Sequence, residues 1–404
     1  MIKNNLNFFN NIQKKNLDSK SIKKFTKLFP KIFSKVFTDI NSSKKTINTL
    51  NKKFNFNFEF KDLEKFKKFK KIAIIGMGGS ILGSEAVSHF LKEKINKKIY
   101  FFNDLNIEKI KNFKKKKNLN KILFFVISKS GNTVETLSNF FTLKIIKKNS
   151  KNIIIISEKK NNLLYSLSKK FNLFYIEHKN YIGGRYSVLS EVGIVPAYLM
   201  GININKLRSG SLKSLKKTQL FLKDSTIMLS SLLSFKKIDN LIFLNYCPEL
   251  EKFLFWCQQL IAESLGKNGK GFLPTISNAP KDHHSLLQLY LDGPKNKLFY
   301  IFSHEESSKE KINIKEILKE KNFLNNKTLS SIKKAQKNAL IKTLKNKNIP
   351  FREFKIKNIN EEVLGELFSY FILETVIIGK LTNINPFDQP AVEQVKIYTK
   401  DLLN

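Results

Sequence analysis

The stretch "KILFFVISKSGNT", residues 121–133, joins a fully apolar run to a polar end that contains a glycine. The unbroken apolar run at 122–127 is typical of a strand buried on both faces, as in a parallel sheet. The hydroxyl groups, the lysine and the glycine that follow are typical of a turn that can hold an anion. These residues alone leave three alternatives open: a phosphate site, a nucleotide site, or a turn without a ligand.

Similar apolar runs occur on both sides of this stretch. They cover residues 72–75, 99–102, 153–156 and 173–176, and most are separated by segments of helical period such as 133–148. This alternation predicts a doubly wound α/β domain with a parallel sheet. A looser second set follows, with strands expected at 241–247 and 298–302 and helices at 249–266 and 361–381. The sequence therefore predicts an α/β fold with two doubly wound parallel-sheet subdomains.

The expected domain organisation has four parts. In residues 1–65, Phe and Leu alternate with Lys at helical spacing, which predicts a helical N-terminal segment. The two α/β domains are expected at 66–205 and 206–380, and a helix at 381–404. Because no Pro/Gly/Ser-rich linker separates the two α/β domains, we expect them to pack as one body.

The composition limits the function classes. The 404 residues carry a formal net charge of +40, but the lysines are spread from residue 3 to residue 400 among abundant Asn, Ile and Phe. This pattern indicates an AT-rich genome rather than a nucleic-acid or membrane site. Two cysteines cannot build a disulfide framework, and the segment up to Pro30 lacks the apolar stretch of a signal peptide. With no apolar stretch long enough to span a bilayer, a soluble, cytoplasmic protein is expected.

A second glycine-rich loop, "GMGGSILG" at 76–83, follows the first apolar run. Glycines let backbone N–H groups approach an anion, and the helix that follows adds its positive end. Ligands of parallel sheets collect beyond the carboxyl ends of the strands, so the two loops predict a phosphate site. Either loop alone could be a purely structural turn. The residues expected to bind phosphate or substrate are Gly79, Ser80, Ser128, Lys129, Ser130 and Thr133.

The first loop does not fit a dinucleotide fingerprint. Gly76 and Gly78 begin G-x-G-x-x-G, but Gly83 comes two residues late. The acidic Asp104 lies 28 residues after Gly76, against an expected separation of roughly 20. No G-x-x-x-x-G-K-[ST] occurs either, so no nucleotide cofactor is expected.

Three further segments carry candidates for chemistry. Arg185 follows two glycines and could point into a pocket, although a surface arginine is the alternative. Gln259 and Glu263 are four residues apart and share a helix face, where a carboxylate could act as a base or be merely solvated. In "KDHHSLLQ" (281–288) we expect His283 to face solvent and His284 to be the acid/base candidate. Without HExxH or other ligand spacing, no metal site is expected.

These segments together resemble the glucose-6-phosphate isomerase family, in its short bacterial form. "SKSGNT" alone would indicate only the wider sugar-isomerase (SIS) superfamily, which also holds aminosugar-phosphate enzymes and sugar-phosphate sensors. The resemblance implies two SIS-type, flavodoxin-like domains and no cofactor. The matching segments, in the family's order, are "GMGGSILG", "SKSGNTVET", "GGRYSVLS", "ESLGKNGKG", "DHHSLLQ" and "NPFDQPAVEQVK", the last at 385–396.

The resemblance also implies an activity, the reversible aldose–ketose isomerisation of D-glucose 6-phosphate to D-fructose 6-phosphate. Glu263 matches the base that moves a proton between C2 and C1 through a cis-enediol(ate). Arg185 matches the cation that stabilises this intermediate, and Gln259 matches a neighbouring polar contact. An isomerase of this kind needs a carboxylate, a cation and a phosphate anchor, and the residues supply each.

The resemblance implies that ring opening depends on two residues outside the segments of Arg185 and Glu263. His284 matches an acid/base that reaches into the partner subunit's site, which implies a homodimer. Lys396 matches a lysine that assists ring opening, and Gln389 lies near the substrate in the family. The segment "DHHSLLQ" around His284 departs from the family pattern, which usually has a Leu before the His and a Gly after the Leu. His283 therefore keeps the choice between the two histidines open.

Two other functions stay open at this stage. The chain could be a non-catalytic sugar-phosphate sensor, but such proteins usually carry a DNA-binding domain, and residues 1–65 show no clear helix-turn-helix pattern. It could also be an isomerase of broader specificity that accepts mannose 6-phosphate, because tolerance at C2 depends on the shape of the pocket.

Overall fold

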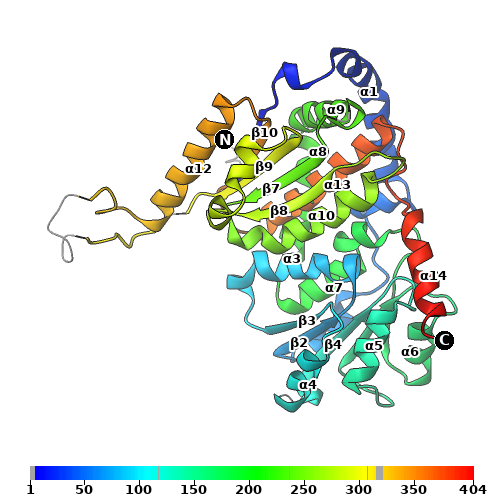
Figure 1. Ribbon diagram of the computed structural model, residues 1–404. Coiled ribbons are helices and arrows are strands. Elements are labelled where there is room, and N and C mark those ends of the chain that lie inside the picture. The colour runs from blue at the N-terminus through cyan, green and yellow to red at the C-terminus, as the bar shows by residue number, and fades with distance from the viewer. Residues whose placement is uncertain (1–4, 117, 218, 236, 307, 315–321) are drawn as a thin grey trace.

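The computed structural model describes residues 5–116, 118–217, 219–235, 237–306, 308–314 and 322–404. Within them the chain forms two five-stranded sheets, one above the other in Figure 1, with helices between and around them. The α/β prediction with two parallel-sheet domains is confirmed, apart from one antiparallel edge strand in the second sheet.

The first sheet is parallel throughout and has the order β3-β2-β4-β5-β6. Counted along the domain this is 2-1-3-4-5, the flavodoxin-like order. Every residue of β4 and β5 is buried, which explains their uninterrupted apolar sequence. All five expected strands are found, at β2 (Lys71–Ile75), β3 (Lys98–Phe102), β4 (Ile122–Ile127), β5 (Ile153–Ser157) and β6 (Phe174–Glu177).

The second sheet has the order β1-β10-β9-β7-β8. Four of its strands are parallel and repeat the 2-1-3-4 arrangement of the first sheet, while β1 takes the fifth place and runs antiparallel to β10. The strands are β1 (Leu6–Asn11), β7 (Asn240–Asn245), β8 (Leu273–Asn278), β9 (Lys297–His304) and β10 (Phe351–Ile356).

The helical prediction for residues 1–65 is therefore wrong for residues 6–11. Leu6 is buried, and the ring of Phe8 packs against Phe221, Phe354 and Tyr370. Pairing with β10 covers an edge that would otherwise expose unpaired backbone groups. The other proposed domain boundaries stay predictions.

The helices that matter for the site lie between the sheets. α10, from the second unit, packs on α3, from the first, and one large buried cluster contains residues of both units. A smaller cluster lies in each unit. Burying a leucine such as Leu254 or Leu260 of α10 stabilises the fold by about 2 kcal/mol. The longer helices are α1 (Ser19–Asn41), α3 (Leu82–Phe90), α4 (Ile107–Lys116), α5 (Val134–Leu143), α6 (Leu163–Lys170), α7 (Glu191–Met200), α8 (Ile204–Lys217), α9 (Gln219–Phe235), α10 (Glu251–Leu265), α12 (Leu329–Asn346), α13 (Glu361–Leu381) and α14 (Glu393–Asp401); α2 (Phe60–Leu63) and α11 (Leu287–Asp292) are short.

The most apolar stretch of the sequence lies in α13. Nearly all of its residues are buried, as expected for a core helix. Among the described residues, no helix is both long enough and apolar enough to span a bilayer.

Candidate active site

The two predicted anion loops leave the first sheet side by side. β2 and β4 are neighbours at the point where the strand order reverses, which is where open α/β sheets form their ligand crevice. The loop after β2 contains a short 3-10 helix, Gly78–Ser80, and residues 128–133 follow β4. A Cβ atom at Gly76 would lie 3.0 Å from the Ile127 carbonyl oxygen, so the loops begin in close contact.

The loop after β4 brings three hydroxyl groups together. Ser128 Oγ lies 2.8 Å from Thr133 Oγ1, and each is 3.5 Å from Ser130 Oγ. The turn requires Gly131, whose φ is +69° and whose added Cβ atom would lie 1.8 Å from Asn162 Oδ1. The hydroxyls therefore converge at the start of α5, an arrangement suited to an anion.

Lys129 has a carboxylate partner that the sequence did not indicate. Its Nζ lies 3.7 Å from Glu158 Oε1, and Glu158 also pairs with Lys160. Burial lowers the pKa of Lys129, and the charge of Glu158 opposes this. Glu158 directly follows β5, so its place at the carboxyl end of a strand was the signal that could have identified it.

The first loop packs directly on the segment that carries Arg185. A Cβ atom at Gly79 would lie 2.2 Å from the Gly184 carbonyl carbon and 2.5 Å from Arg185 N, so only glycine fits. A Cβ atom at Gly78 would lie 2.7 Å from Gln259 Nε2. The loop, Arg185 and Gln259 therefore form one packed unit, with Ser80 next in the loop.

Arg185 is buried, with 2% of its side chain exposed, so the surface alternative does not hold. It lies in the 3-10 helix Gly184–Leu189. Its Nε donates to Ser264 Oγ at 2.7 Å, and its Nη1 lies 3.2 Å from Glu263 Oε2. Tyr186 OH is 2.8 Å from the same Ser264 hydroxyl. Ser264 and Tyr186 were not predicted, although both are sequence neighbours of predicted residues.

The C-terminal tail completes the surroundings of this guanidinium. Nη2 donates to the Pro386 and Asp388 carbonyl oxygens at 2.7 and 2.9 Å. Nη1 also donates to Gln389 Oε1. The predicted Gln389 is thus brought to Arg185 by the turn after Pro386.

Glu263 lies at the open side of the cluster. Its side chain is 28% exposed, and its Oε1 accepts a hydrogen bond from Gln259 Nε2 at 2.9 Å. Gln259 Oε1 is buried without a hydrogen-bond partner among the described residues. A buried acceptor of this kind is available to a hydroxyl group of a ligand.

The two histidines differ from the expectation. His283 Nε2 lies 2.7 Å from Tyr246 OH, and burial lowers the pKa of His283, so this ring does not simply face solvent. His284 ends the 3-10 helix Lys281–His284 and is exposed. Within the described part of the chain, no hydrogen bond or ion pair joins His284 to Glu263 or Arg185.

Lys396 also lies apart from the cluster. It is exposed on α14, at the outer side of the molecule in Figure 1, and its Nζ contacts Glu393 Oε1 at 2.6 Å. In the described residues it has no ion pair with Glu263. No group of three His, Cys, Asp or Glu side chains in the described ranges could hold a metal ion.

The site thus combines a carboxylate, a buried cation and two loops suited to anions. Comparison with known proteins identifies the family. A sequence model of the family described as phosphoglucose isomerase matches residues 33–404. The chain belongs to the phosphoglucose isomerase family. It is 33% identical to the glucose-6-phosphate isomerase of Methanocaldococcus jannaschii, over 83% of this chain and 85% of that one. The corresponding enzyme of Campylobacter jejuni is 31% identical over 83% of this chain and 86% of its own.

Solved structures show the same fold. A glucose-6-phosphate isomerase from Chlamydia trachomatis superposes with a TM-score of 0.77 at 15% identity, covering 99% of this chain and 88% of that one. A hypothetical protein from Thermus thermophilus superposes with a TM-score of 0.82 at 22% identity, covering 98% and 100%. The family resemblance and the fold predicted from the sequence are both confirmed.

Proposed function

We propose that this member of the phosphoglucose isomerase family interconverts D-glucose 6-phosphate and D-fructose 6-phosphate through a cis-enediol(ate). The observation that carries the proposal is the contact between buried Arg185 and the partly open carboxylate of Glu263, beside two loops of anion-binding character. The names of the homologous isomerases support the substrate.

Glu263 is the base in this proposal. Its carboxylate takes the proton from C2 of the open-chain aldose, and the proton of the C2 hydroxyl passes to the C1 oxygen. The same carboxylate then returns its proton to C1, which leaves the carbonyl group at C2. Arg185 lies 3.2 Å from this carboxylate and can stabilise the negative charge on the enediolate oxygens. Its bonds to Ser264 and the Pro386 carbonyl hold the guanidinium in place before substrate binds.

The loops fix the position of the substrate. Ser128, Ser130 and Thr133 offer hydroxyl donors to the phosphate at the start of α5, and Lys129 supplies a charge. The backbone of Gly79 and Ser80 lines the substrate beside Arg185, and Gln259 and Gln389 flank it. Holding the phosphate sets which carbon lies against Glu263.

Ring opening is assigned to His284 and Lys396. The exposure of His284 is consistent with a role in the site of a second subunit, so we propose a homodimer. When substrate binds, the ammonium group of Lys396 would leave Glu393 and contact the sugar. A cytoplasmic location is part of the same proposal.

A coupled assay tests the substrate. Glucose 6-phosphate should give fructose 6-phosphate with no added metal. Turnover of mannose 6-phosphate in a parallel assay would establish broader specificity. Saturable binding of glucose 6-phosphate without turnover would overturn the proposal in favour of a non-catalytic sugar-phosphate sensor.

A further inference from the structure

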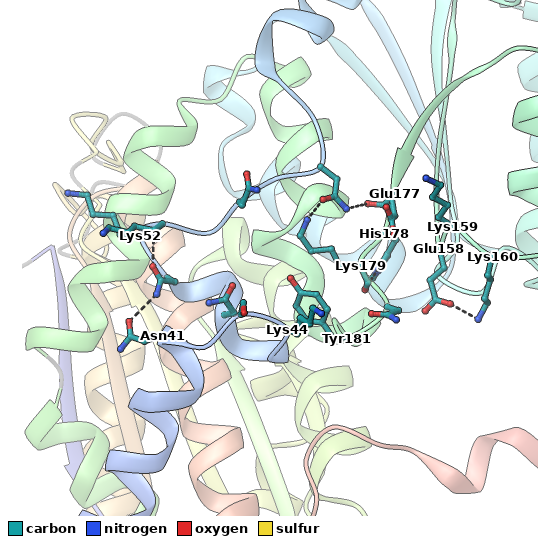
Figure 2. Close-up of a pocket in the computed structure, with 17 residues that line it drawn as sticks. Asn41, Lys44, Lys52, Glu158, Lys159, Lys160, Glu177, His178, Lys179 and Tyr181 are labelled. Carbon is teal, nitrogen blue, oxygen red and sulfur yellow. Dashed lines mark hydrogen bonds and ion pairs between the residues drawn. The ribbon is translucent and has the colours of Figure 1, made fainter.

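A cleft lies apart from the residues of the proposed chemistry. Its volume is about 1130 Å³. It lies between residues 41–57 and the segments at the ends of β5 and β6 (Figure 2). β5 ends at Ser157 and β6 at Glu177, so the cleft opens at the carboxyl edge of the first sheet, on strands beyond the crevice between β2 and β4. The proposed isomerase chemistry uses none of its lining residues.

The lining of the cleft is strongly basic. More than a third of its residues are lysine, about twice the share of basic residues in the chain, where Lys and Arg number 73 of 404. Two glutamates, Glu158 and Glu177, oppose these lysines. His178 adds no charge at neutral pH, because burial lowers its pKa to about 4.

Four of these lysines have no ion pair among the described residues: Lys44, Lys52, Lys53 and Lys159. The other two are held. Lys160 pairs with Glu158, and Lys179 lies 3.0 Å from the buried Glu191. Glu191 also accepts from the Asn57 backbone N–H at 3.0 Å, which fixes this wall of the cleft. Unpaired lysines around one hollow repel one another, and an anionic ligand removes that repulsion.

Asparagines make up the other polar part of the lining. Six of them surround the cleft: Asn41, Asn48, Asn51, Asn55, Asn57 and Asn180. The side-chain amides of Asn41, Asn48, Asn51 and Asn57 already donate to protein oxygens. Side-chain amides both donate and accept, so those of Asn55 and Asn180 suit hydroxyl groups as well as phosphate oxygens of a ligand. The combination of unpaired ammonium groups and amides matches a ligand with both phosphates and hydroxyls.

We propose that this cleft binds a polyhydroxylated organic phosphate, through Lys44 and Lys159 and the amides of Asn55 and Asn180 in its lining. Lys44 belongs to the segment after α1, and Lys159 follows β5. The ligand therefore joins the N-terminal segment to the first sheet. Figure 2 shows both segments facing the same space.

Glu158 links this cleft to the substrate loop, and this step rests on the proposed function. The carboxylate is shared between Lys160, in the cleft, and Lys129, in the loop after β4. When a bound phosphate pairs with Lys160, Glu158 loses that partner and pairs more closely with Lys129. Lys129 then binds the substrate phosphate more weakly. Occupancy of the cleft is therefore inhibitory, and it raises the KM for the sugar phosphate without lowering kcat.

Direct binding tests the site independently of catalysis. The probe is myo-inositol 1,4,5-trisphosphate, which has no carbonyl group to isomerise. Isothermal titration of the full chain should show one saturable site, and the double variant K44Q/K159Q should lower the affinity about tenfold or more. The control K23Q/K27Q removes two exposed lysines of α1 and should leave the affinity unchanged. Absence of binding, or equal loss in both variants, overturns the proposal.

Competition distinguishes the cleft from the substrate site. Added glucose 6-phosphate should weaken probe binding only partially, because the sites are linked but separate. Complete displacement would place the probe in the substrate site and contradict the proposal. If the isomerase assay fails while lysine-dependent binding remains, the cleft stands and the proposed activity falls. If activity is present but the trisphosphate leaves KM unchanged, the link through Glu158 is wrong.

Discussion

Two arginines in the described part of the chain are almost completely buried, and each contacts a glutamate. Arg185 has 2% of its side chain exposed and lies 3.2 Å from Glu263, and Arg352 is fully buried and lies 3.0 Å from Glu374. The difference lies in the carboxylates. Glu263 is 28% exposed, whereas Glu374 is 2% exposed.

The surroundings of the Arg352–Glu374 pair explain why its carboxylate is buried. Glu374 Oε1 accepts from Tyr370 OH at 2.7 Å, and its Oε2 accepts from Tyr300 OH at 3.2 Å. Ser225 donates to the same carboxylate. Protein groups surround the Glu374 carboxylate, so the Arg352–Glu374 pair stabilises the core of the second unit. Among the described residues, the hydrogen bonds to the Glu263 carboxylate come from Arg185 and Gln259, and its 28% exposure leaves a side for substrate.

Glu263→Gln should have the largest effect. An amide cannot accept the C2 proton, so kcat for glucose 6-phosphate should fall about a thousandfold, within the range for loss of a general base. Urea unfolding should show a stability close to that of the parent, because Glu263 is partly solvated. A variant that retains near-normal kcat would show that Glu263 is not the base.

Glu374→Gln should give the opposite pattern. An amide at this position turns a donor toward Tyr370 or Tyr300 and leaves Arg352 without its counter-charge. The free energy of unfolding should fall by about 3 kcal/mol, while kcat of the folded fraction stays near the parent value. A variant with unchanged stability would contradict the structural role of this pair.

Gly79→Ala tests the packing of the first loop against the segment that carries Arg185. The added methyl group would meet the backbone of Gly184 at 2.2 Å and shift Arg185. A displacement of about 1 Å should lower kcat/KM about a hundredfold. Gly183→Ala is the matched control, because its Cβ atom would meet only Tyr186 Cδ2 at 3.4 Å. Equal losses in both variants would rule out this explanation.

Lys129 should produce a smaller, pH-dependent effect. Burial lowers its pKa, so Lys129 loses its charge at a lower pH than an ordinary lysine. The KM for glucose 6-phosphate should therefore rise at alkaline pH. Lys129→Gln should raise KM about tenfold at neutral pH and abolish the alkaline rise, whereas the exposed Lys148→Gln should do neither. A rise that persists in the Gln variant would assign the titration to another group.

The sequence predicted the strands whose two faces are both apolar and missed the others. β10, with the sequence FREFKI, carries buried charges that are neutralised by partners on the helices before and after it. Arg352 pairs with Glu374, and Glu353 pairs with Lys337 of α12. β1 becomes a strand only by pairing with β10, which lies near the other end of the chain. No local pattern encodes such contacts.

The candidate site divides in the same way. Glycine and hydroxyl residues at strand ends were visible because their spacing is local, and the structure brings Gly79, Arg185, Gln259, Glu263 and Gln389 together. Glu158 was missed, because its contact with Lys129 depends on the neighbouring positions of β4 and β5 in the sheet. His284 and Lys396 stay predictions from family resemblance.

The most direct test of the open Arg185–Glu263 pair is exchange at C2. Glucose 6-phosphate labelled with deuterium at C2 is incubated with the enzyme in ordinary water, and the label in the recovered sugar phosphates is followed by NMR. Proton transfer by Glu263 predicts that, with the parent enzyme, part of the deuterium moves to C1 of fructose 6-phosphate and part is lost to solvent by exchange on the carboxyl group, and that neither occurs with Glu263→Gln. Full retention of the label in fructose 6-phosphate formed by the parent, or undiminished loss with Glu263→Gln, would contradict it.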